Sequence, residues 1–97
     1  MANYIMLLNY TAQGHKNVLD APNRTDEAKK RFKALGANLR ECFAVTGPYD
    51  EIAIVEAPNE DVASTAAHAL CSLGNVRVQT LRGFTQEEHR QILQKLS

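Results

Sequence analysis

Apolar positions along the chain change their spacing several times, and each change predicts a new element. The run from Tyr4 to Asn9 is short and almost wholly apolar, which is typical of a largely buried strand. From Arg24 to Leu35 apolar residues recur at helical spacing among basic ones, and Gly36 is placed to end that helix. Between these segments, residues 11–23 are polar and predict a loop with room for one helical turn.

The middle of the chain has the pattern of a hairpin followed by a helix. Leu39–Thr46 and Glu51–Ala57 are rich in β-forming residues, and the tetrapeptide Gly47–Asp50 between them has the composition of a tight turn. Asn59 then stands where a helix N-cap is expected, before two acidic residues that favour the positive end of a helix dipole. The apolar stripe of this helix is predicted to be Val62, Ala66, Ala69, Leu70 and Leu73.

The last quarter of the chain predicts one more strand and one more helix. Residues 76–81 alternate and indicate a fourth strand, and Thr85 with Glu88 three positions later has the pattern of a capping box. The order strand, helix, strand, strand, helix, strand, helix is α+β. It is the ferredoxin-like βαββαβ order with an additional C-terminal helix. Two helices on one face of a four-stranded sheet leave the other face open.

The predicted hairpin separates large apolar side chains from small ones. A turn centred on residues 48 and 49 predicts the cross-strand pairs Val45 with Ile52, Phe43 with Ile54, and Glu41 with Glu56. Small residues on the opposite side suit the docking of an alanine-rich helix. Phe43, Val45, Ile52 and Ile54 are therefore expected on the open face, where a second copy would cover them in a sheet-to-sheet dimeric α/β barrel. The two glutamates are either a functional carboxylate pair or a solvated rim.

Composition excludes several classes of protein but does not indicate which reaction, if any, the protein catalyses. With 97 residues, 44% of them hydrophobic, the chain is expected to be a single folded domain over residues 1–97. Eleven basic and eleven acidic residues cancel, so no excess charge favours nucleic acid or a membrane surface as a partner. No signal peptide or long apolar span is apparent, and a cytoplasmic location is the expectation.

Cysteine and histidine positions do not follow a metal-binding pattern. Cys42 and Cys71 are expected to be reduced core residues rather than a disulfide. His68 and Cys71 have the spacing of helix neighbours, which suits either a metal pair or two residues of a packed helix. We expect neither a metal nor a cofactor.

Polar side chains gather where the first strand ends and the third and fourth begin. The candidate ligand-binding residues there are Thr11, Gln13, Lys16, Asn17, Tyr49, Asp50, Asn75 and Arg77. Such groups suit a small polar or anionic ligand, although the same residue types also serve turns and loops. His15 or Asp50 would be the proton acceptor if the protein were a small enzyme, but no known catalytic motif is present.

These residues also carry a family resemblance. Gly47, Pro48, Tyr49 and Asp50 resemble the signature of the GYD domain family, and the likeness extends over nearly the whole chain, from Tyr4 to Phe84. The resemblance implies a ferredoxin-like domain related to dimeric α/β barrels, with an unassigned biochemical role and no catalytic residues to transfer. Our first hypothesis is a homodimeric or higher homo-oligomeric module that binds a small ligand or a partner. The alternatives are a cofactor-free enzyme of the oxygenase or isomerase type and a purely structural assembly unit.

Overall fold

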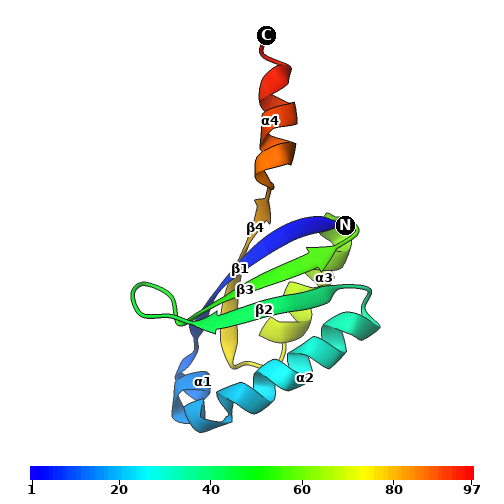
Figure 1. Cartoon of the computed structure of the whole chain (residues 1–97). Coiled ribbons are helices and arrows are strands. Elements are labelled where there is room, and N and C mark those ends of the chain that lie inside the picture. Colours follow the sequence, from blue (N-terminus) through cyan, green and yellow to red (C-terminus); the bar gives the residue numbers. More distant parts are fainter.

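The computed structural model describes residues 1–97 and confirms the α+β class with ferredoxin-like topology (Figure 1). Its elements are β1 (Ala2–Tyr10), α1 (Ala12–Lys16), the 3-10 helix η1 (Val18–Asp20), α2 (Ala21–Ala34), β2 (Asn38–Ala44), β3 (Glu51–Ala57), α3 (Glu60–Cys71), β4 (Val76–Gly83) and α4 (Gln86–Gln94). The strands form one sheet in the order β2-β3-β1-β4, and all neighbouring strands are antiparallel. The end of β1 therefore lies beside the starts of β3 and β4, as predicted.

The segment between β1 and α2 differs from its prediction, because helices replace most of the expected loop. The side chain of Thr11 accepts a hydrogen bond from the Gly14 N–H and caps α1. Helix α2 begins at Ala21 rather than near residue 24, with Pro22 in its first turn. Proline is well tolerated there, because the first N–H groups of a helix have no partner within the helix.

The pairing of β2 with β3 corrects the predicted register by two residues. Phe43 lies opposite Ile52, and Glu41 lies opposite Ile54. The predicted pairs were wrong because β2 ends at Ala44, so Val45 belongs to the loop and its N–H donates to the Asp50 oxygen at 3.0 Å. From Glu41 to Ala44 the shift is two residues, which leaves side chains on their predicted face. Phe43, Ile52 and Ile54 therefore still share one face of the sheet.

The expected pair of glutamates does not form. Glu56 lies opposite Asn38, whose side-chain amide donates to the Glu56 carboxylate at 3.0 Å. An irregularity between Leu39 and Glu41 changes the register at Arg40, and the Arg40 guanidinium approaches Glu56 at 3.8 Å. Glu56 is thus paired with an amide and a cation, which matches the rim reading and not a functional pair of carboxylates.

The core lies between one face of the sheet and the layer of α2 and α3, which Figure 1 shows on a single side. Met6, Val55 and Phe32 are fully buried there. From α3 the core receives Ala63 and Ala66, and small residues let this helix approach the sheet closely. The predicted stripe is right at Val62, Ala66 and Leu70, which lie in the core or pack against it, but not at Leu73, which stays 59% exposed because α3 ends at Cys71.

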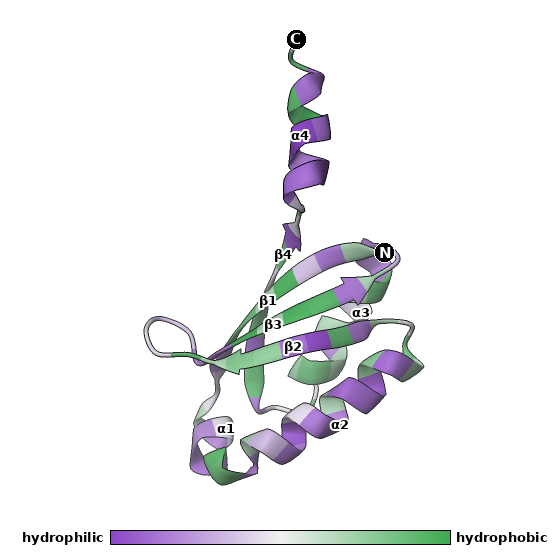
Figure 2. Cartoon of the chain, in the orientation of Figure 1, coloured by the Kyte–Doolittle hydropathy of each residue, from purple (hydrophilic) through white to green (hydrophobic).

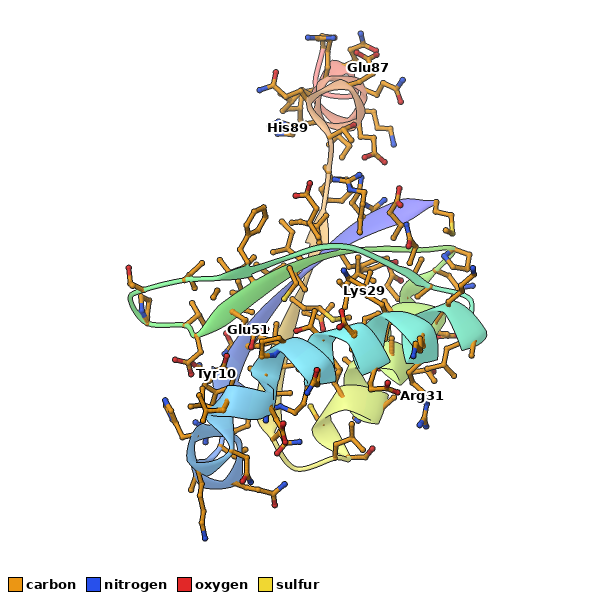
Figure 3. All side chains as sticks on the ribbon, turned by 60° about the horizontal axis from the view of Figure 1, so that its bottom comes forward. Tyr10, Lys29, Arg31, Glu51, Glu87 and His89 are labelled. Carbon is orange, nitrogen blue, oxygen red and sulfur yellow. The ribbon has the colours of Figure 1, made fainter.

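The C-terminal helix is separate from this core. Both halves of the predicted capping box of α4 are present, since Thr85 and Glu88 each accept a hydrogen bond from the other's backbone N–H. No residue of α4 is buried, and the helix extends away from the sheet, beyond the side opposite α2 and α3 (Figures 1 and 3). None of the helices has the length and apolar character that crossing a bilayer demands.

Candidate functional site

The face of the sheet opposite α2 and α3 carries an uncovered group of apolar side chains. Alternation along each strand assigns them to this face, and the register places them side by side. This open-face patch consists of Ile5, Leu7, Phe43, Ile52, Ile54 and Leu81. Phe43 is 52% exposed and Leu81 is 49% exposed. In Figure 2, β1 and β3 show green, hydrophobic stretches, and both α2 and α3 lie on the other face of the sheet (Figure 1).

The Gly47–Asp50 segment is anchored to the sheet by its last residue. Asp50 accepts a hydrogen bond from the Tyr10 N–H at 2.8 Å, and its own N–H donates to the Leu8 oxygen at 2.9 Å. The Tyr49 hydroxyl donates to the Gln79 side chain in β4 at 3.0 Å. Gly47 has a positive φ of 119°, a conformation that favours glycine. The signature residues thus fix this loop across the end of β1.

A second group of predicted residues ties α1 to the turn after α3. The Thr11 hydroxyl donates to the Gly74 oxygen at 2.6 Å, and the Gln13 amide donates to the Asn75 side chain at 3.0 Å. Gly14 is buried against Asn75, and a Cβ at Gly14 would lie 2.0 Å from the Asn75 oxygen. The structure therefore brings Thr11, Gln13 and Asn75 together as predicted, with most of their polar groups already bonded to one another.

Other members of the predicted cluster stay apart from this group. Lys16 and Arg77 are exposed and form no ion pair, and the Asn17 amide donates to the Gln13 oxygen at 3.1 Å. Of the eight predicted residues, only Asn75 lines a main cavity of the fold. Ligand binding by this cluster stays a prediction.

The two candidate proton acceptors differ in their surroundings. His15 is exposed on α1 and lies edge-on against the Tyr10 ring, with the ring centres 5.2 Å apart. The Asp50 carboxylate is engaged by the Tyr10 N–H. Neither residue lines a main cavity, so the geometry does not favour either as a catalytic base.

A polar cluster that the sequence analysis missed lies on the helix side of the sheet. Glu51 is only 9% exposed, and its carboxylate accepts hydrogen bonds from the Tyr10 hydroxyl and, at 3.1 Å, from the Cys42 thiol. Figure 3 shows Tyr10 and Glu51 close together near the start of α2. The missed signal was the alternation of β3, since Glu51 has the parity of the buried Ala53 and Val55.

The surroundings of Glu51 favour the protonated forms of two neighbouring groups, the Cys42 thiol and the Tyr10 hydroxyl. Burial, followed by the hydrogen bond to Glu51 and its negative charge, raises the pKa of the Cys42 thiol to about 12. The same causes raise the pKa of the Tyr10 hydroxyl well above its ordinary value. Both groups therefore stay neutral at physiological pH and act as donors to the carboxylate. Both cysteines are free thiols, as expected.

Fold and surface together define a small ferredoxin-like α+β domain with one uncovered sheet face and a projecting C-terminal helix. The model of the GYD domain family matches residues 4–93, so the chain belongs to the GYD domain family and the resemblance is confirmed. A 30% identical relative from Thermus thermophilus, a "glutamine synthetase and cystathionine beta-lyase binding protein", aligns over 87% of this chain and 90% of its own length.

Solved structures agree with this fold. The feast or famine regulatory protein Rv3291c from M. tuberculosis, complexed with L-methionine, superposes with a TM-score of 0.68 at 13% identity. That match covers 89% of this chain but 52% of the regulator, so the chain spans about half of the larger protein. TTHA0845 from Thermus thermophilus superposes with a TM-score of 0.55 at 25% identity. That match covers 88% of this chain and 95% of the TTHA0845 chain.

Proposed function

We propose that this protein is a binding module that assembles as a homodimer through the open-face patch and binds metabolic enzymes. The single observation that supports it best is the patch itself. Ile5, Leu7, Ile52 and Ile54 occupy the two central strands, where an apolar face exposed to water is unfavourable. Burying one such side chain contributes about 1.5–3 kcal/mol, so covering several of them is a substantial driving force.

A second copy is the occupant that suits this face. The predicted interface residues Phe43, Ile52 and Ile54 lie together on it, and Val45 continues from it into the loop. Two such sheets packed face to face bury both patches at once, and a two-fold arrangement places the same residues on each side.

Helix α4 supports the same assembly. It projects beyond the open side of the sheet, where a second copy would lie (Figure 1). Its apolar residues Ile92 and Leu93 are 40% and 48% exposed, and Leu96 just beyond it is 84% exposed. These side chains have no cover within the chain, and in the proposed dimer they contact the second copy.

The choice of enzymes as partners rests on the relative from Thermus thermophilus, which is similar over nearly its whole length and is described by its binding of two enzymes. The strand-end cluster is the proposed contact region, because Lys16 and Arg77 are exposed cations with no ion pair within the chain. More specifically, we propose that the strand-end cluster also binds a small anionic ligand.

The test is a titration of the purified protein against purified glutamine synthetase and cystathionine beta-lyase from the same organism. We expect saturable binding to at least one of them, weakened by Lys16→Ala or Arg77→Ala. Lys30→Ala is the matched control, because Lys30 is an exposed cation on α2 whose ion pair with Glu27 is long, at 3.5 Å. Absence of binding to both enzymes by folded protein would contradict the proposed partners.

A further inference from the structure

The Glu51 cluster opens onto a cavity that neither the dimer nor the strand-end cluster uses. This cavity, of about 310 Å³, is open to solvent between the start of α2, the ends of β1 and β2 and the start of β3. It is lined by Tyr10, Ala21, Pro22, Thr25, Asp26, Cys42, Ala44 and Glu51. Two of these residues are carboxylates and none is basic, while Arg24 and Lys29 lie outside the lining but close enough for their charges to act on Tyr10 and Cys42.

The buried carboxylate in this cavity has no cationic partner. No lysine, arginine or histidine forms an ion pair with Glu51. Arg24, whose guanidinium lies 5.9 Å from the centre of the Tyr10 ring, donates instead to the main-chain oxygens of Asn17 and Gly14 at 2.8 and 3.3 Å. A buried charge is normally paired, and leaving it without a counter-charge is unfavourable. Glu51 therefore favours a cation supplied from outside the chain.

The cavity presents hydrogen-bond acceptors to a ligand, whereas the side-chain donors that line it already donate within the chain. The Tyr10 hydroxyl and the Cys42 thiol already donate to the two carboxylate oxygens of Glu51, one to each. The Thr25 hydroxyl already donates to the Ala21 oxygen at 3.1 Å. A carboxylate has about four acceptor positions, so Glu51 retains unused ones, and Asp26 adds more at the exposed rim. A ligand here must bring hydrogen-bond donors of its own.

We propose that this cavity binds a small primary alkylammonium ion. Its N–H groups donate to Glu51, and its positive charge forms the direct ion pair that no cation of the chain makes with this carboxylate. Ala21, Pro22 and Ala44 provide small apolar surfaces against which a short alkyl body packs. The Tyr10 ring adds an aromatic surface, which attracts cations. This site lies on the helix side of the sheet, so it stands independently of the proposed dimer and its enzyme partners.

The test is a titration of the 97-residue chain with n-propylammonium chloride at neutral pH, monitored by the NMR shifts of the backbone amides. We expect saturable shifts centred on Tyr10, Thr25, Cys42 and Glu51. Sodium chloride and n-propanol at the same concentrations should not reproduce them, because one lacks directed N–H donors and the other lacks the charge.

Two variants and a control decide the outcome. Glu51→Gln keeps the side-chain shape but removes the charge, and we expect the dissociation constant to rise by about tenfold or more. Asp26→Asn lies at the exposed rim, should fold whatever happens at Glu51, and should weaken binding by about twofold. Glu27→Gln removes the same charge from the neighbouring exposed position and should change nothing.

Several results would overturn the site. These are shifts that never saturate, shifts that sodium chloride or n-propanol reproduces, and undiminished binding by folded Glu51→Gln. If Glu51→Gln does not fold, equal affinities of Asp26→Asn and Glu27→Gln would overturn it instead.

Discussion

The two faces of the sheet are both apolar at their centre, but helices of the chain cover only one of them. On the covered face, Met6 and Val55 are fully buried beneath α2 and α3. Their neighbours Leu7 and Ile54 point the other way, are as apolar, and have no layer above them. A sheet with one wet face normally alternates apolar with polar residues. The apolar open face therefore supports the proposed dimer, in which a second copy supplies the missing layer.

The largest expected effect of this asymmetry concerns the adjacent residues Met6 and Leu7 in β1. Met6→Ala should lower the free energy of unfolding by about 2–5 kcal/mol, because it leaves a cavity in a packed core. Leu7→Ala should cost about 1 kcal/mol in dilute protein, where its side chain stays partly exposed.

Urea unfolding at several protein concentrations checks this pair of variants. The loss caused by Leu7→Ala should grow with concentration as the open face becomes covered, while the loss caused by Met6→Ala should not. Equal losses that are independent of concentration would mean that the two faces do not differ in the proposed way.

A smaller effect is expected at Gly14 in α1, which packs directly against the backbone of Asn75. Gly14→Ala places a Cβ against the Asn75 oxygen, which cannot move aside as a flexible side chain can. The expected cost is about 1–3 kcal/mol, typical of overpacking. Ala12→Ser on the exposed side of α1 is the control, and thermal unfolding is the measurement. A Gly14→Ala protein as stable as the wild type would show that α1 is free to shift.

The smallest expected effect concerns the Cys42 thiol. Its raised pKa leaves little thiolate, so alkylation near pH 8 should be slower at Cys42 than at Cys71, and Glu51→Gln should accelerate it. The thiol is stabilised in its neutral form in the folded state. Its contribution to stability is therefore complete below its unfolded pKa and is lost as pH rises toward about 12. Mass spectrometry of the alkylated protein gives both rates.

Sequence patterns predicted the elements of this fold well because each depends on local signals. The capping box at Thr85 and Glu88, the stop at Gly36 and the alternation of β3 all act within a few residues. The hairpin register was wrong because it depends on the length of the loop, and the composition of Gly47–Asp50 does not fix that length. Face assignments survived only because the error was an even number of residues.

The candidate site was less predictable for a different reason. Polar residues at the strand ends were found by type, but type does not reveal that Thr11, Gln13 and Asn75 bond mainly to one another and to the turn. Glu51 was overlooked although the alternation of β3 assigns it to the helix side, and α2, whose first turns line the same cavity, starts several residues earlier than its apolar spacing indicates. Tertiary contacts therefore decided which polar residues line a cavity.

Sedimentation equilibrium of the full-length protein tests the covering of the open face most directly. The account predicts a species of twice the 10.8 kDa chain mass that dissociates on dilution. Phe43→Lys, which places a charge in the patch on an edge strand, should raise the dimer dissociation constant by about a hundredfold or more. Leu19→Lys, at a fully solvated position outside the sheet, should leave it unchanged. A single-chain mass at every concentration, identical for wild type and Phe43→Lys, would contradict the account.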